Sequence, residues 1–170
     1  MAQEFEMTDI GFISFNLKLK VRQLDDGFFV GQQARVKEVM DRFNMSNTKS
    51  LDTPMEIGAK LSKNEKGEKM DPTLLKSLIG CLRYLICTRS DILLGVGIIS
   101  QFIDVPTTEH KNATKRILRY LKGTIDFGLF YSSFKKFQLV GYSDSDFVGD
   151  IDDRKRTSGF LFFMGYNAIS

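Results

Sequence analysis

Hydrophobic and polar residues alternate near the start of the chain, on both sides of a turn. The run FNLKLKV at residues 15–21 repeats with a period of two, which is typical of a half-buried β-strand. Asp25, Asp26 and Gly27 form a turn sequence, and the run FFV at residues 28–30 follows as the returning strand. The pattern therefore predicts a β-hairpin.

A helical spacing replaces this alternation after the hairpin. Val36, Val39, Met40 and Phe43 lie at positions i, i+3, i+4 and i+7, which predicts an amphipathic helix. Residues 56–70 are polar and contain two glycines, so they predict an exposed loop.

Three more helices are predicted between residues 71 and 123. The side chain of Asp71 can cap the first helix, and Pro72 suits its first helical position. Its wide apolar face consists of Leu74, Leu75, Leu78, Ile79, Leu82 and Leu85. Ser90 or Asp91 can cap the second helix, which ends before Pro106. The third can begin after Thr107 and end at Gly123 as its C′ residue.

Short aromatic-rich runs follow this helical region. Residues 127–131, 137–143 and 160–164 have the composition of β-strands separated by turns, and another strand begins near residue 168. A hairpin and helix, a three-helix region and a set of antiparallel strands together predict an α+β fold.

The chain of 170 residues has globular composition and a formal net charge of only +3. Its positive charge is concentrated in the predicted helix at residues 107–123, where five basic residues and Glu109 sum to +4, which leaves −1 for the remainder. On a helical wheel one narrow stripe holds Lys111, Lys115, Arg119 and Lys122, with Arg116 beside it. Two interpretations stay open at this point, a solvated helix face or a surface that binds phosphate groups.

Other residues with distinctive chemistry give weaker signals. Cys81 and Cys87 are six residues apart and face different sides of a helix, so we expect two reduced, mostly buried thiols and no metal site. His110 has no ligand-like neighbour at a suitable spacing, and we expect it on the surface. Asp144 and Asp146 lie at i and i+2 of a strand end, where they could share a cation or simply form a polar turn.

Several segments in chain order resemble the Pol polyproteins of copia-type LTR retrotransposons. They are FEMTDIG at 5–11, SLIGCLRYL at 77–85 followed by TRSD at 88–91, KRILRYLKGT at 115–124, GYSDSDFVG at 141–149 and TSG at 157–159. The corresponding family patterns are F-x-M-x-D-L-G, S-L-[IV]-G-x-L-x-Y-L with T-R-P-D, K-R-[IV]-L-R-Y-L-K-G-T, G-Y-S-D-[AS]-D-W-A-G and T-S-G.

The resemblance implies a domain map. Residues 1–136 would be the C-terminal part of a reverse transcriptase, with a primer-grip-like hairpin and thumb or connection helices. Residues 137–170 would be a truncated ribonuclease H-like domain. Ribonuclease H chemistry uses two Mg²⁺ ions held by four carboxylates. Asp144 matches the first of these, while the polymerase carboxylates would lie upstream of Met1 and the other ribonuclease H carboxylates after Ser170.

We therefore expect a remnant of a polymerase for RNA-directed DNA synthesis that is catalytically inactive and binds no Mg²⁺ tightly. Weak, non-specific binding of RNA–DNA hybrid or other nucleic acid through the 107–123 helix would persist. Departures from the family pattern include Asn16-Leu17-Lys18 where the family has F-L-G, and Ser90 where it has proline.

The alternative is a domesticated protein that binds another protein, or an effector-like protein. Residues 116–119 match the R-x-L-R signature of secreted effectors, but that motif has meaning only after a signal peptide, and the acidic start of the chain does not resemble one. The longest apolar run is too short to span a bilayer. We expect a cytoplasmic or nuclear location and no membrane partner.

Overall fold

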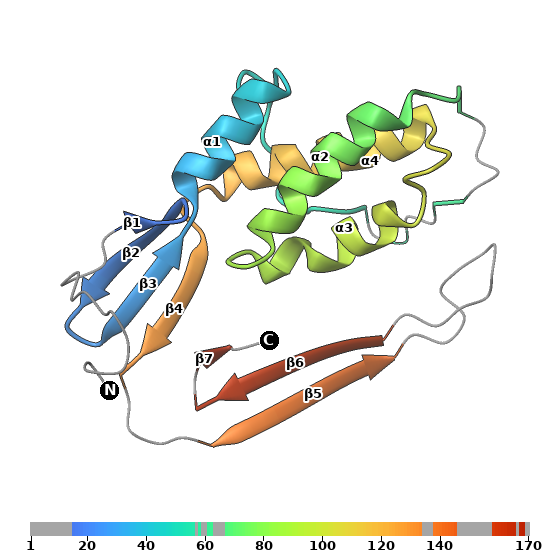
Figure 1. Cartoon of the computed structure of the whole chain (residues 1–170). Helices are drawn as coiled ribbons and strands as arrows, with labels where there is room; N and C mark the ends of the chain where they lie inside the picture. Colours follow the sequence, from blue (N-terminus) through green and yellow to red (C-terminus); the bar gives the residue numbers. More distant parts are fainter. Residues whose placement is uncertain are drawn as a thin grey trace, which may run out of the picture.

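The computed structural model of the chain describes residues 15–56, 58, 61–62, 67–133, 138–145, 158–165 and 167–168. Within these residues the fold is mixed α+β, as predicted: a four-stranded antiparallel sheet, a group of helices and a three-stranded antiparallel sheet (Figure 1). The first sheet has the order β1-β2-β3-β4, and the second has the order β5-β6-β7.

The first sheet begins with a chain reversal that the sequence pattern did not predict. β1 (Phe15–Asn16) pairs with β2 (Leu19–Leu24) across a tight turn at Leu17 and Lys18, so the expected continuous strand at 15–21 is wrong. Leu17 and Lys18 have φ angles of +47° and +63°, in the left-handed region that favours glycine. Lys18 stands at the glycine position of the F-L-G pattern that this segment resembles, and leucine and lysine give no turn signal.

The predicted hairpin around Asp25 and Asp26 is confirmed, and a fourth strand completes the sheet. β3 (Gly27–Gly31) pairs with β2 on one side and with β4 (Gly128–Ser132) on the other. A Cβ atom at Gly27 would lie 2.2 Å from the carbonyl oxygen of Tyr131, and one at Gly128 would lie 2.3 Å from that of Val30. Both glycines are therefore needed for the β3–β4 pairing.

The core lies among the helices. α1 (Gln33–Arg42) buries Val36, Val39 and Met40 as predicted, and Phe43 packs against the same core at its end. α2 (Pro72–Leu85) begins as predicted, since the Asp71 carboxylate accepts a hydrogen bond of 2.9 Å from the Thr73 backbone. Its buried side chains are Leu75, Leu78, Ile79, Cys81, Leu82 and Leu85. Leu74 was wrongly assigned to this face, because it lies at the edge and is 43% exposed.

The helix caps agree with the sequence only in part. Thr107 caps α4 (Thr108–Gly123), as predicted. Neither Ser90 nor Asp91 caps α3 (Leu93–Ser100), because both belong to a 3₁₀ turn, η1 (Ser90–Ile92), that precedes it. Gly123 is the last residue of α4 and not the C′ residue. A Cβ atom there would lie 3.1 Å from the Cβ of Ser50, so the glycine permits close packing.

Two predictions of exposure are corrected by the structure. His110 is fully buried rather than exposed. Its ring stacks on Phe102 with centroids 4.3 Å apart, and its Nδ1 accepts a hydrogen bond of 3.0 Å from the Thr107 backbone, which closes a capping box. Cys81 is buried as expected, whereas Cys87 is exposed.

The second sheet comprises β5 (Leu139–Ser145), β6 (Ser158–Met164) and β7 (Asn167–Ala168). Asn167 links it to the first sheet, since its side-chain amide bonds to both the backbone N–H (2.6 Å) and the carbonyl (3.2 Å) of Ser132. In Figure 1 the β5–β6 hairpin runs below α3. Among the described residues of 56–70 no helix or strand forms, apart from a single bridge between Lys69 and Thr107.

Candidate nucleic-acid interface

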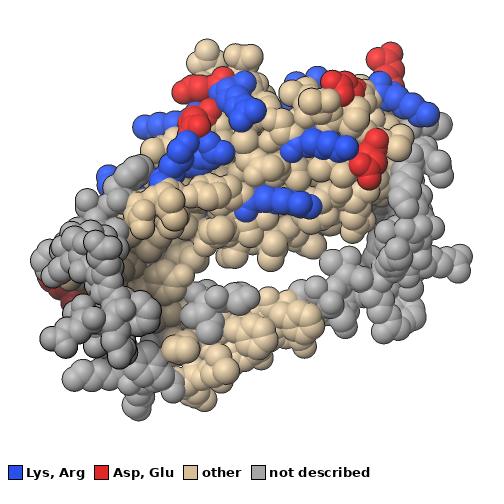
Figure 2. Space-filling model, in the orientation of Figure 1, with Lys and Arg blue, Asp and Glu red and all other residues tan. Residues whose placement is uncertain are grey.

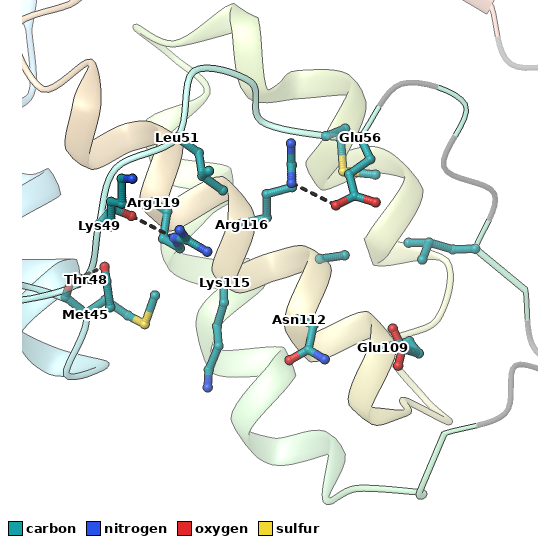
Figure 3. Close-up of a pocket in the computed structure, with 13 residues that line it drawn as sticks. Met45, Thr48, Lys49, Leu51, Glu56, Glu109, Asn112, Lys115, Arg116 and Arg119 are labelled. Atoms are coloured by element: carbon teal, nitrogen blue, oxygen red, sulfur yellow. Dashed lines mark hydrogen bonds and ion pairs between the residues drawn. The ribbon is translucent and has the colours of Figure 1, made fainter.

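One side of α4, which carries Lys115, Arg116 and Arg119, forms one wall of a groove, whereas Lys111 and Lys122 are not among the groove's lining residues. Lys and Arg side chains are spread over the helical part of the surface among carboxylates, and none is visible on the described part of β5 and β6 (Figure 2). The groove, of about 630 Å³, lies between α4 and the 45–56 segment (Figure 3). Its lining includes Met45, Lys49, Leu51, Met55, Glu56, Glu109, Asn112, Lys115, Arg116 and Arg119. Lys115 is exposed, whereas the other basic residues of α4 are half-buried.

Three of the five basic residues of α4 hold the 45–56 segment. Arg119 donates from Nε to the carbonyl of Lys49 at 2.7 Å, as drawn in Figure 3. Lys122 donates to the carbonyls of Ser46 and Thr48, each at 2.7 Å. These cations therefore have a structural role that the sequence pattern did not reveal, because their acceptors lie about 70 or more residues earlier.

Arg116 differs from the others because its charge is paired. It forms an ion pair of 2.9 Å with Glu56 and a hydrogen bond of 2.9 Å with the hydroxyl of Thr53. A carbonyl oxygen orients a cation without cancelling its charge, whereas a carboxylate compensates it. Lys111, Lys115, Arg119 and Lys122 form no ion pair within the described residues, so the stripe keeps most of its positive potential.

A buried polar network fixes the C-terminal end of α4. Arg89 is 2–3% exposed and binds the Asp91 carboxylate through Nε (3.0 Å) and Nη2 (2.7 Å). Its Nη1 donates to the carbonyl of Thr124 at 2.9 Å. The hydroxyl of Tyr120 completes the network with a 2.6 Å hydrogen bond to Asp91. The network therefore joins the TRSD segment at 88–91 to the KRILRYLKGT segment at 115–124.

The network shifts two pKa values in opposite directions. Burial disfavours the charged form of Asp91, but the hydrogen bonds from Arg89 and Tyr120 outweigh it and lower the pKa of the carboxyl. Burial, together with the hydrogen bond to Asp91, raises the pKa of Tyr120. Asp91 is thus an anion that stabilises a buried guanidinium.

The predicted metal-binding aspartates are only partly described. Asp144 lies in β5, where its backbone is opposite Gly159 of β6, and its side chain is not described. Asp146 and the segment at 5–11 lie outside the described residues. In the described part of the chain, no three His, Cys, Asp or Glu side chains come close enough to share a metal ion.

Known proteins similar to this chain include the polyproteins of plant transposons. The Pol polyprotein of transposon RE1 from Arabidopsis thaliana is 36% identical over the whole chain, and that of TNT 1-94 from Nicotiana tabacum is 37% identical. The chain spans 12–13% of the length of these two polyproteins. It also covers 70% of the uncharacterized mitochondrial protein AtMg00810 from Arabidopsis thaliana, at 33% identity.

These relatives define the class as retrotransposon polyproteins. The chain belongs to the Pol family of copia-type retrotransposons and corresponds to a fragment of Pol. No family model matches it. No solved structure matches it. None of the described helices is long and apolar enough to cross a membrane.

Proposed function

We propose that this chain is a Pol remnant that binds the phosphate backbone of nucleic acid along α4 and performs no catalysis by itself. The observation that supports binding is a row of cations, Lys111, Lys115, Arg119 and Lys122, that form no ion pair with the residues the structure describes. Arg116 is at the margin, since Glu56 compensates it. Backbone contacts of this kind do not read base sequence, so RNA–DNA hybrid is one of several possible ligands.

The 45–56 segment favours this function by preorganising two of the cations. Arg119 and Lys122 are held by backbone carbonyls, which limits the rotamer entropy that binding would cost. Lys111 and Lys115 make no described ion pair and are available to phosphate. The family relationship supports the same partner class through the parent polyproteins, in which residues 1–136 would belong to the reverse transcriptase and residues 137–170 to the ribonuclease H-like domain.

Replacing Lys111 and Lys115 together by Ala should weaken binding of an RNA–DNA hybrid oligonucleotide and flatten its salt dependence. Each lost phosphate contact reduces the slope of log affinity against log salt by roughly 0.9, so about two units are expected. Fluorescence anisotropy at several salt concentrations measures the slope. Lys76→Ala with Arg83→Ala is the control for the loss of two positive charges, because both residues are exposed on α2, where Lys76 pairs with Asp104, and neither belongs to α4. Equal slopes for the two double variants would refute the α4 interface.

The 170 residues should neither extend a primer nor cut the RNA strand of a hybrid in the presence of Mg²⁺. The physical reason is that two divalent ions need several carboxylates, and the resemblance assigns only Asp144 in these residues to that role. Primer-extension and hybrid-cleavage assays measure both activities. Cleavage above that of an Asp144→Asn control would contradict the proposal.

A further inference from the structure

α3 is apolar on every side, yet one of its sides is uncovered. The helix has the sequence LLGVGIIS and carries no charged residue. A helix of this kind is normally buried all round in a globular protein. One side packs into the core, but on the other Leu93 and Leu94 are exposed, Leu94 to 61%, and Ile98 is half-buried. A Cβ atom at Gly97, on the same side, would meet no atom within 4 Å. We call Leu93, Leu94 and Ile98 the α3 face.

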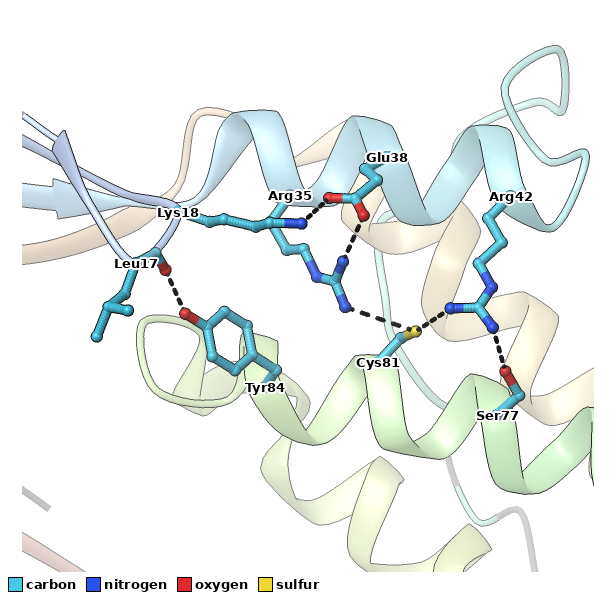
Figure 4. Close-up of polar contacts among 8 residues, drawn as sticks. All are labelled: Leu17, Lys18, Arg35, Glu38, Arg42, Ser77, Cys81 and Tyr84. Atoms are coloured by element: carbon cyan, nitrogen blue, oxygen red, sulfur yellow. Dashed lines mark hydrogen bonds and ion pairs between the residues drawn. The ribbon is translucent and has the colours of Figure 1, made fainter.

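The other helices have polar groups on their outer sides. α1 and α2 are joined outside the core by hydrogen bonds (Figure 4). Arg42 donates to the hydroxyl of Ser77 at 2.9 Å, and the hydroxyl of Tyr84 donates to the carbonyl of Leu17. The outer side of α4 carries the basic residues described above. The apolar α3 face therefore differs from the rest of the helical surface.

The second sheet has an uncovered apolar face of its own. Leu139 pairs with Met164, and Gly141 pairs with Phe162, so the side chains of each pair leave the same face of the sheet. Phe160 is two residues from Phe162 and lies on this face as well. The four large side chains are exposed, Phe160 to 62%. We call Leu139, Phe160, Phe162 and Met164 the sheet face.

The two faces do not cover each other within one chain, although the β5–β6 hairpin runs below α3 (Figure 1). Leu94 and Phe160 are both more than half exposed. Figure 2 shows open space between the helical surface and the described part of β5 and β6. Asn167 ties β7 to Ser132 of β4, which fixes one end of the second sheet at the first sheet and not at α3.

We propose that a second copy of this chain covers both faces, with the α3 face of each copy packed on the sheet face of the other. Exposed apolar patches of this kind mark protein interaction sites, and a helix on a sheet is a standard pairing of layers. Each copy carries one face of each type, so a two-fold symmetric dimer covers all four faces at once.

The size of the two faces agrees with what a stable dimer needs. A large apolar side chain that is already partly covered can still bury about 90 Å². The seven side chains of the α3 face and the sheet face therefore offer about 600 Å² per copy. Two copies would bury about 1,200 Å² in total, at the lower end of specific protein interfaces. Neither face contains a basic residue of α4, so the dimer is independent of the proposed nucleic-acid binding.

Sedimentation velocity of the full chain without nucleic acid, over a dilution series, tests the proposal. The expected mass is twice the 19.4 kDa of one chain at high concentration, and it falls toward that of one chain on dilution. A wild-type chain that stays monomeric over the whole series overturns the dimer and leaves the proposed function standing.

Two variants, one on each face, test which surfaces meet. Leu94→Glu and Phe160→Lys should each abolish the dimer, because each would bury a charge without a partner. An equal mixture of the two should dimerise again. In that mixture one α3 face and one sheet face are unaltered, and the other contact brings together two charges of opposite sign. Leu74→Glu is the matched control, because Leu74 is an exposed leucine of α2 outside both faces, and its dimer should persist.

Circular dichroism establishes that each variant is folded, and Leu94→Ser with Phe160→Ser replaces any charged variant that is not. Loss of the dimer in both single variants, with recovery in the mixture, supports the exchange of faces between copies. A dimer that persists in either single variant, or a mixture that stays monomeric, overturns it.

Discussion

Replacing Arg89 by Met should lower the free energy of unfolding by about 3 kcal/mol at pH 7, because it removes the buried guanidinium from an ion pair and from its hydrogen bonds. Arg89 is almost fully buried and bonds to Asp91 and Thr124, whereas the Asp91 side chain is 33% exposed, which keeps the expected loss at the low end of the usual range. Urea unfolding measures it. Arg83→Met, at an exposed position of α2, is the control and should change stability by no more than about 0.5 kcal/mol.

The same pair predicts a pH dependence with a definite sign. Because Arg89 and Tyr120 lower the pKa of Asp91 in the folded state, the pair stabilises the fold fully above the pKa of the unfolded carboxyl. This stability is lost as the pH falls through the lower folded value. The gap between wild type and the Arg89→Met variant should therefore narrow below about pH 4. A gap that stays constant down to pH 2 would show that the ion pair contributes little.

Replacing Leu82 by Ala should cost about 3 kcal/mol of unfolding free energy, since Leu82 is fully buried at the centre of the helical core. The lost methyl and methylene contacts and the resulting cavity both contribute. Leu74→Ala on the same helix is the matched control, because Leu74 is 43% exposed, and it should cost less than about 1 kcal/mol. Chemical denaturation of both variants measures the difference. Equal losses would mean that α2 presents a different face to the core.

Elements whose determinants are close together in the chain were predicted from the sequence. The side chains of Asp71 and Thr107 cap helices by accepting hydrogen bonds from backbone N–H groups within three residues, and the spacing of Val36, Val39 and Met40 depends only on the helical repeat. The Asp25–Asp26 turn was likewise a local signal. Predictions failed where the position of a side chain depends on tertiary packing. His110 was expected at the surface because no ligand-like residue lies near it at a suitable spacing, whereas its burial and its stacking on Phe102 depend on how α4 packs after the preceding loop.

What the sequence by itself determined was the family, the α+β class and the positions of most helices and strands. Only the tertiary structure decided that β4 pairs with β3, which lies more than 90 residues earlier in the chain. It also decided which basic residues of α4 form hydrogen bonds with the 45–56 segment. Arg119 and Lys122 reach carbonyls 70 or more residues away, so a helical wheel could not show that they are bonded. Periodicity reports which face of an element is apolar, whereas the partner of the polar face depends on long-range contacts that no local pattern contains.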